Sequence, residues 1–275
     1  MSRAIQEARV AQRARVAAAR RRRTTAAAAV TTVLAVVATM VLVKVGQQGP
    51  KKATVAAAST AAPASLVTAV ASVPPTTIDT VGAGSATSPT AVNGAALTQD
   101  GKPRVVYVGA EWCPYCAAER WAVVQALSRF GTFTGLGQTA SASDDVYPGT
   151  ATLSFHGGTY TSPYLGFSGY ETQDGSHRAL DTPPADVESV FETQGGGSFP
   201  FVDLGGTSII TGASYDPGLL RGLTQAQVVA AIADPTTAVS KAVVGEANRI
   251  TARLCALTGG QPAAVCSAAG VRAAS

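Results

Sequence analysis

The amino-acid sequence predicts an α/β fold, with a central sheet flanked by helices and a C-terminal helical extension, preceded by one transmembrane helix and a flexible linker. The buried-strand pattern Val105–Val108 leads directly into a helical pattern that begins near Pro114. Further strand-like and helical patterns follow to the end of the chain, which is typical of a sheet covered by helices. Charge is scarce in residues 24–97, which predicts that this part lies outside the folded domain.

The composition limits the classes of partner. The chain has 275 residues, which allow one domain with extensions or two small domains. Its formal net charge is +4, but residues 1–23 hold eight arginines and one glutamate, a charge of +7, so the remainder carries −3. Nucleic-acid binding requires a basic face on the folded part, and we therefore expect no nucleic-acid partner.

Residues 24–44 are predicted to form a single transmembrane helix. The 20 residues from Thr24 to Val43 carry no charge, and about this length spans a bilayer core. Four arginines precede the stretch, so the positive-inside rule places the basic segment 1–23 in the cytoplasm and the C-terminal part outside it. A cleaved signal peptide and a buried soluble helix are the alternatives.

Residues 45–97 are predicted to be a flexible linker. They are rich in Ala, Thr, Ser, Pro, Val and Gly and show no sustained periodicity. Such a segment buries too little apolar surface to offset the entropy lost on ordering. The folded domain is therefore expected to span residues 98–275.

The first half of this domain is predicted to contain a strand, a helix and a hairpin. After the strand at Val105–Val108, one apolar helical face is predicted, with Arg120 and Gln125 off that face and an end near Gly131. The apolar face consists of Ala117, Trp121, Val124 and Leu127. Thr150–Phe155 and Thr159–Phe167 flank a glycine-containing connection and are predicted to pair as a hairpin.

The second half is predicted to contain a helix, a pair of strands and two further helices. Ala185–Glu192 is predicted to be a short helix ended by glycines. Residues 198–204 are predicted to form a strand opened by a proline, and Ser208–Ile210 is predicted to be its return strand. Thr224 with Gln227 makes a capping-box signature, and apolar spacing over residues 239–254 marks the last long helix.

The candidate chemistry lies in Cys113-Pro114-Tyr115-Cys116, at the junction of the first strand and helix. A helix N-terminus offers unpaired N–H groups and positive potential, which stabilise the reactive thiolate of Cys113. Cys116, one turn further on, is placed to resolve a mixed disulfide. Pro114 fits the first turn because its missing N–H costs nothing there, and Tyr115 is the variable residue that faces the thiols.

The segments EWCPYCAAERW and GSFPFVDLGG resemble the active-site and cis-proline regions of the thioredoxin superfamily. Over residues 98–270 the chain resembles a bacterial family of membrane-anchored thioredoxin-like proteins of unknown function, which carry a CPYCAAERW-type motif, a TYTSPY-type strand and a C-terminal cysteine pair. The resemblance implies a thioredoxin-like sheet, with Pro200 as a cis-proline facing the disulfide. Phe199 would then present its backbone to the substrate.

One departure concerns proton transfer. Thioredoxins keep a buried acid six residues before the first cysteine, where this chain has Tyr107. Glu111, two residues before Cys113, could act in its place by contact or by its field. The other interpretation of Glu111 is a solvated loop glutamate.

The remaining cysteines and histidines leave alternatives open. Cys255 and Cys266 flank a helix-breaking turn and are expected to form a structural disulfide, and a second redox pair that relays electrons is the alternative. A zinc site would need two close Cys or His pairs, so we expect no metal. His156 and His177 are interpreted as loop or turn residues, or as groups that titrate near the site.

These observations predict an extracytoplasmic, membrane-tethered thiol–disulfide oxidoreductase. Its substrates would be cysteines of exported proteins, and it needs no cofactor. An oxidising compartment favours disulfide donation or isomerisation over reduction, with a membrane redox partner resetting the pair. The alternative is a non-catalytic binding module of the cell envelope with a stable disulfide.

Overall fold

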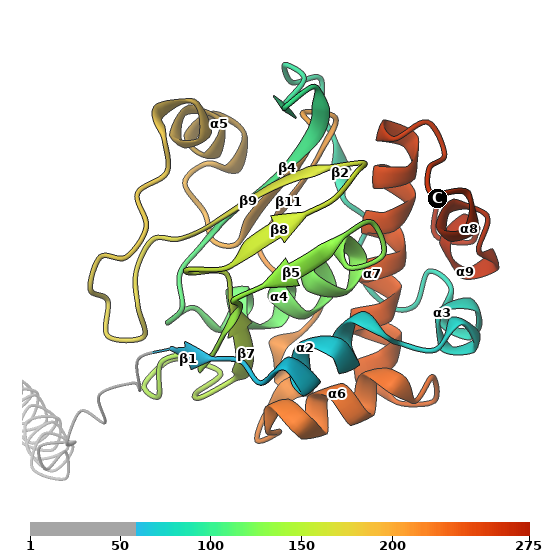
Figure 1. Cartoon of the computed structure of the whole chain (residues 1–275). Helices are drawn as coiled ribbons and strands as arrows, with labels where there is room; N and C mark the ends of the chain where they lie inside the picture. The colour runs from blue at the N-terminus through green and yellow to red at the C-terminus, as the bar shows by residue number, and fades with distance from the viewer. Residues whose placement is uncertain (1–58) are drawn as a thin grey trace, which may run out of the picture. The chain divides into compact units, whose positions relative to one another are not determined.

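The computed structural model describes residues 59–275, which form a mixed α/β arrangement (Figure 1). The predicted cytoplasmic segment, the transmembrane helix and the linker residues 45–58 lie outside the described residues. Six strands form the main sheet, with β4 pairing to three of them. In chain order they are β2 (Thr90–Ala91), β3 (Thr98–Gln99), β4 (Lys102–Gly109), β9 (Gly166–Glu171), β10 (Phe201–Leu204) and β11 (Ser208–Thr211).

The sheet has helices on both faces, and the side chains of its central strand alternate between the two helical layers. On one face Val105 and Tyr107 of β4 pack in the main core cluster with α4 (Pro114–Leu127) and α7 (Ala238–Leu257). On the other face Val106 and Val108 pack against α5 (Ala185–Gly195). The buried strand predicted at Val105–Val108 is therefore confirmed, and both of its faces are covered.

The connection between β4 and β9 fixes the position of the first helix. β4 pairs with β9 in parallel, with Gly109 opposite Glu171. β10 pairs with β4 in the antiparallel sense, and β11 returns alongside β10 across the predicted turn at Gly205–Gly206. Both glycines have positive φ (69° and 79°), which a tight strand connection requires there.

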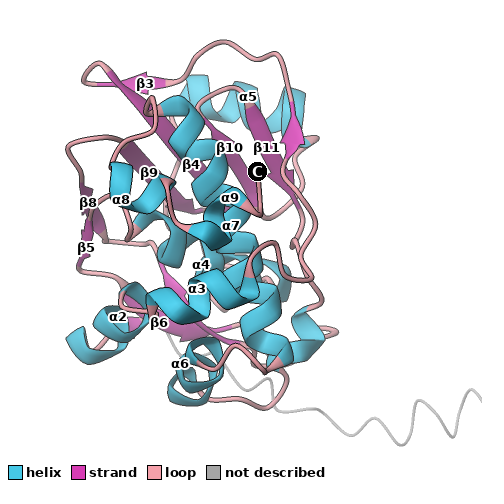
Figure 2. Cartoon of the chain, turned by 90° about the vertical axis from the view of Figure 1, so that its right-hand side faces the viewer, coloured by secondary structure: helices cyan, strands magenta, loops and turns pink. Residues whose placement is uncertain are grey.

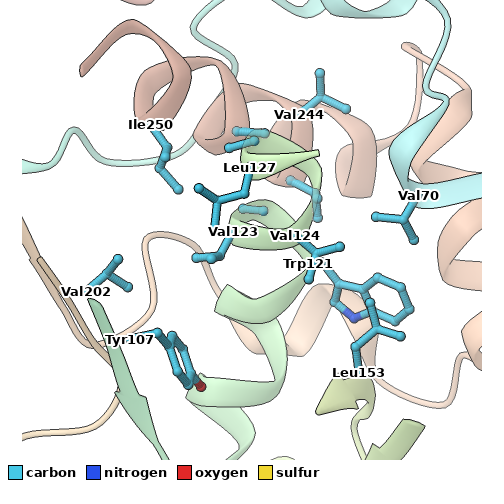
Figure 3. Packing of buried hydrophobic residues seen from close by; sticks show 14 of the residues in the cluster. Val70, Tyr107, Trp121, Val123, Val124, Leu127, Leu153, Val202, Val244 and Ile250 are labelled. Atoms are coloured by element: carbon cyan, nitrogen blue, oxygen red, sulfur yellow. The ribbon is translucent and has the colours of Figure 1, made fainter. Parts of the chain in front are cut away.

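Helix α4 corrects the prediction of a single apolar face. Every α4 residue except Tyr115 is buried, including Arg120 and Gln125. The cause is its central position, because α4 packs against α7, α2 (Ala64–Ala71) and β7 (Ala151–Ser154) besides the sheet. Figure 3 shows this core, in which Trp121 lies between Leu153 and Val70. The indole of Trp121 donates to the Ala151 carbonyl at 3.1 Å, as a core residue should.

The predicted hairpin between residues 150–155 and 159–167 is wrong. β7 pairs with β6 (Gly137–Ala140), while β8 (Thr159–Thr161) pairs with β5 (Thr132–Thr134). β1 (Thr60–Ala61) adds a third strand beside β6. Both partner strands come from residues 131–150, to which the sequence pattern assigned no element. The β-rich segments were recognised, but their pairing depended on strands that had not been predicted.

The predicted linker is also wrong from residue 59 onward. Helices α2 and α3 (Pro75–Val81) lie in this segment, and α3 packs against α7. The Asn248 side chain donates to the carbonyls of Ile78 and Gly82 at 3.0 and 2.7 Å. Val70 is fully buried. An alanine- and threonine-rich segment can thus be ordered when a neighbouring helix supplies the apolar surface and the hydrogen bonds.

The C-terminal region follows the predicted order. α6 (Gln225–Ala233) begins with the capping box of Thr224 and Gln227, and α7 follows it. A 3₁₀ turn at Pro217–Leu220 precedes α6, and the short helices α8 (Ala263–Cys266) and α9 (Ala269–Arg272) end the chain. Figure 2 shows α3, α8 and α9 gathered on α7.

Within residues 59–275 no single helix is long and apolar enough to cross a membrane. Only the pair α6 and α7, bent by 76° at the break between them, meets the length and composition criteria together.

Candidate functional site

The Cys-x-x-Cys motif lies where β4 ends and α4 begins. Cys113 is the N-cap residue of α4, with extended backbone angles (φ −76°, ψ 121°), and Pro114 is the first helical residue. The sulfur of Cys113 accepts a hydrogen bond from the backbone N–H of Cys116 at 3.2 Å. Both cysteines are free thiols in this structure. The predicted placement of Cys113 at a helix N-terminus is confirmed.

The two thiols differ in acidity. The hydrogen bond from the Cys116 thiol lowers the pKa of Cys113, and the Cys116 N–H and the charge of Arg120 lower it further, although burial opposes them. Burial raises the pKa of Cys116 well above its usual value, and the neighbouring Cys113 adds to this. Cys113 is 4% exposed and Cys116 is 0% exposed. The outer thiol is therefore the one poised to react as a thiolate.

Aromatic side chains surround the dithiol. Trp112 and Phe199 pack on the small cluster of Ala110, Cys113 and Cys116. The Phe199–Pro200 peptide bond is cis, as the resemblance implied, and Pro200 directly precedes β10. Tyr115 is 40% exposed and meets Tyr147 edge to face at 5.8 Å between ring centroids. The structure thus brings Phe199, Pro200, Pro114 and Tyr115 to the same end of the sheet.

A loop after β9 adds a histidine to this rim. The His177 ring lies 4.7 Å from the Trp112 ring between centroids, and the Trp112 indole donates to the side chain of Gln173 at 2.8 Å. Asp174 holds the loop, because its carboxylate accepts from the backbone N–H groups of Ser176 and Arg178. His177 is therefore placed beside the residue that precedes Cys113. His156 instead pairs with Asp181 at 2.8 Å.

Glu111 is a buried residue, so its interpretation as a solvated loop glutamate is wrong. Its side chain is 0% exposed, and Oε1 accepts from the hydroxyl of Ser154 at 2.5 Å. Oε2 has no hydrogen-bond partner among residues 59–275. The backbone N–H of Glu111 donates to Gln173, which fixes the loop before the cysteines against the end of β9.

Arg120 and Glu171 form a buried ion pair near the motif, although the sequence pattern placed Arg120 off the apolar face of its helix. Arg120 Nε and Nη2 donate to the two carboxylate oxygens of Glu171, each at 2.7 Å, and both side chains are fully buried. Nη2 also donates to the Ala110 carbonyl at 2.7 Å. The guanidinium lies 5.9 Å from the centre of the Tyr107 ring.

Tyr107 occupies the position of the expected buried acid. Its hydroxyl finds no hydrogen-bond partner among the residues that the structure describes, and burial raises its pKa well above the usual value. Figure 3 shows the ring on β4 with its hydroxyl directed toward α4. Tyr107 is therefore a neutral side chain, and it supplies no carboxylate to the dithiol.

The second cysteine pair is a disulfide, as predicted. Cys255 of α7 and Cys266 of α8 are bonded, with their Cα atoms 5.6 Å apart. Both pack against the main core cluster, whereas Cys113 and Cys116 belong to a separate one. Within residues 59–275 no group of three or more His, Cys, Asp or Glu side chains could hold a metal ion.

The sequence reasoning missed three contributors, Arg120, Glu171 and the Trp112–His177 contact. Arg120 carried a usable signal, because it lies four residues after Cys116 and so on the same helical face. Glu171 and His177 carried none. Their positions depend on the pairing of β9 with β4 and on the loop that follows β9.

Residues 88–190 match the model of a family described as a domain of unknown function (DUF929). The match begins before β3 and ends within α5, so it includes both motif cysteines and Glu171. No curated protein and no solved structure was found to match the chain.

Proposed function

We propose that this protein is a thiol–disulfide oxidoreductase whose dithiol is Cys113 and Cys116. The observation that carries the proposal is the difference between the two thiols. The first caps a helix and accepts the Cys116 N–H, with its pKa lowered, while the second is fully buried, with its pKa raised. A nucleophile backed by a resolving thiol is the requirement for disulfide exchange.

A thioredoxin-like fold is part of this proposal. β4, α4 and β9 make a parallel βαβ unit, and the β10–β11 hairpin follows, with α7 in the same core cluster as α4. The resemblance implies this order, with the cysteines between β4 and α4 and a cis-proline just before β10. Phe199 would present its backbone to the bound substrate, beside Cys113.

The reaction conserves atoms and electrons in two exchanges. The Cys113 thiolate attacks a substrate disulfide, forms a mixed disulfide and releases one substrate thiolate. The Cys116 thiolate then attacks the sulfur of Cys113 and releases the second, so the substrate gains two electrons and the protein becomes a disulfide. Disulfide donation is the reverse. It needs a disulfide-bearing membrane partner that reoxidises Cys113 and Cys116.

Glu111 is the proposed acceptor of the proton that Cys116 loses. The carboxylate is buried two residues before the motif, and Oε2 has no partner among residues 59–275. Ser154 holds the other oxygen and so orients the group. A carboxylate held in this way would act as a general base and would replace the acid missing at Tyr107.

The proposed location is outside the cytoplasm, on a single membrane anchor. The uncharged residues 24–44 follow the arginine-rich residues 1–23, which supports a cytoplasmic N-terminus. The Cys255–Cys266 disulfide supports an oxidising compartment, because such bonds rarely persist in the cytosol. Cysteines of exported proteins are then the accessible substrates.

The test uses the full-length chain in detergent. Iodoacetamide should modify Cys113 below neutral pH, before Cys116, and the protein should reduce insulin or refold scrambled ribonuclease. Cys113→Ser should abolish exchange, whereas Cys116→Ser should accumulate the mixed disulfide. Ordinary thiol pKa values together with no exchange in either assay would refute the proposal. A reduction potential of about −270 mV would indicate a reductase, and one of about −120 mV would indicate an oxidant.

The second candidate is a binding module of the cell envelope. The burial of Cys113, at 4% exposure, favours it, because little sulfur surface is open to a substrate. On this view the aromatic rim of Trp112 and Phe199 binds a partner, and the cysteines are inert. Specific partner binding that survives Cys113→Ser, without any exchange activity, would favour the binding module.

A further inference from the structure

Arg120 and Glu171 are fully buried charges near the motif, and the proposed exchange reaction gives neither of them a role. Burying an ion pair is costly unless its geometry is excellent and its remaining groups are hydrogen-bonded. Here the pair is bidentate at 2.7 Å, with both side chains fully buried. Arg120 Nη1 has no hydrogen-bond partner among residues 59–275, so the burial of this charge stays costly and packing alone does not explain it.

Helix geometry aims the guanidinium at the cysteines. Arg120 lies four residues after Cys116, which places the two on the same face of α4. Helical side chains also lean toward the N-terminus of their helix. The 2.7 Å hydrogen bond from Nη2 to the Ala110 carbonyl shows that the guanidinium reaches the loop before Cys113.

The other end of the ion pair is fixed by the end of β9. Glu171 ends β9, and its carboxylate also accepts the backbone N–H of Phe155 at 3.3 Å. Its own N–H donates to Asp181 at 3.0 Å. Glu171 is thus held from three sides, and it fixes the orientation of Arg120.

Tyr107 fits this arrangement. Its ring lies 5.9 Å from the guanidinium, within the range of a cation–π contact. The uncharged side chain leaves Glu171 as the carboxylate that is ion-paired with Arg120. This gives a physical reason for a tyrosine at the position where an acid was expected.

We infer that Arg120 is the buried cation that stabilises the thiolate form of the Cys113–Cys116 dithiol, and that Glu171 is the counter-ion that positions it. The inference rests on the proposed function for its purpose, but the acidity of the dithiol can be measured without a substrate. Arg120 takes no part in bond exchange and acts only by stabilising the two sulfurs, so it is a positioning residue.

The direction of the effect follows from charge. The charge of Arg120 lowers the pKa of both Cys113 and Cys116, and the charge of Glu171 opposes it at Cys116. A nearby opposite charge lowers a pKa by roughly 1–3 units, and the counter-ion keeps the effect at the lower end. The thiolate belongs to the reduced protein, so stabilising it makes the disulfide a stronger oxidant. Removing the cation should therefore slow alkylation at acidic pH and favour the disulfide.

The experiment uses the full-length chain in detergent and compares two variants that should change the rate of Cys113 modification in opposite directions. Arg120→Met/Glu171→Gln removes both charges. It should slow iodoacetamide modification of Cys113 about tenfold at about pH 6 and shift the equilibrium with glutathione about tenfold toward the disulfide. Glu171→Gln alone leaves the cation and should accelerate modification. Arg120→Lys should stay within about threefold of the wild type, because it keeps the charge.

Controls separate charge from folding. Glu188→Gln removes a charge from an exposed position of α5 and should leave the modification rate unchanged. Circular dichroism establishes that each variant is folded. If the ion pair served packing alone, Arg120→Met/Glu171→Gln and Glu171→Gln would change the rate of Cys113 modification in the same direction. That result, or an unchanged rate in both variants, overturns the inference. An ordinary Cys113 pKa in the wild type that still rises in the double variant would overturn the proposed function alone.

Discussion

Glu119 and Glu246 should make this protein less stable as the pH rises, and Glu119→Gln should reduce the effect. Glu119 belongs to α4 and Glu246 to α7, and both are fully buried. Ser214 donates its backbone N–H and its hydroxyl to Glu119, at 2.9 and 3.3 Å. Both carboxyl oxygens of Glu246 have no partner within residues 59–275. Burial and the mutual repulsion of the two carboxylates favour the protonated form, against the opposing charge of Arg249 on Glu246.

The magnitude follows from the acidity of Glu119. Burial raises its pKa from 4.5 to about 7, against the opposing hydrogen bonds from Ser214. The folded state therefore holds a proton between these values that the unfolded state releases, so the free energy of unfolding falls as the pH rises through this window. A difference of about 2.5 units corresponds to roughly 3 kcal/mol. Burial and the charge of Glu119 also raise the pKa of Glu246, so the two groups titrate together.

Urea denaturation of the full-length chain at about pH 4.5 and pH 8 measures the effect. The free energy of unfolding of Glu119→Gln, relative to the wild type, should increase by roughly 3 kcal/mol between these pH values, because glutamine never ionises. Glu188→Gln makes the same change at an exposed position of α5 and should show no such increase. The double variant Glu119→Gln/Glu246→Gln should gain less than the sum of the two single variants. A Glu119→Gln variant with the same pH dependence as Glu188→Gln would refute the reasoning.

Three further predictions concern other parts of the molecule. Cys255→Ser/Cys266→Ser should lower the free energy of unfolding by roughly 3 kcal/mol, measured with urea, because an 11-residue separation is closed by the bond. Its Cys113 alkylation rate should not change, and a changed rate would favour the relay interpretation. Gly245→Val should expose the α3 segment to limited proteolysis, because a Cβ on Gly245 would lie 2.8 Å from the loop after α3. The exposed Ala256→Val in the same helix is the control, and equal cleavage of the two variants would contradict the packing argument. Glu111→Gln should slow resolution of the mixed disulfide about 100-fold in rapid-quench experiments while Cys113 alkylation stays normal, and an unchanged resolution rate would remove Glu111 from the mechanism.

Local patterns in the sequence were sufficient wherever one element's own residues decide its structure. The capping box of Thr224 and Gln227 marked the start of α6, and the glycines after residue 194 marked the end of α5. The Cys-x-x-Cys motif was placed correctly at the start of α4, because a strand pattern precedes it and a proline opens the helix. In these cases backbone hydrogen bonding and conformational preference act within a few residues.

Pairing between distant segments could not be read in the same way. Strand-like residues at β7 and β8 were recognised, yet each pairs with a strand from residues 131–150 that had no clear pattern. The segment from residue 59 to residue 97 looked too poor in large apolar residues to fold. It is ordered because α7 offers it a surface and the Asn248 amide.

The sequence by itself determined the identity and order of the reactive groups, the strand-to-helix junction that holds them and the second cysteine pair. Only the tertiary structure decided the electrostatics around the dithiol. Arg120 is fully buried because helices and strands cover α4, and Glu111 is fully buried because its loop is held by Gln173 and Ser154. Glu171 meets Arg120 because the parallel pairing of β9 with β4 brings it opposite Gly109. Burial and long-range pairing determine the electrostatic free energy of a charged side chain, and the neighbouring residues in the sequence predict neither of them.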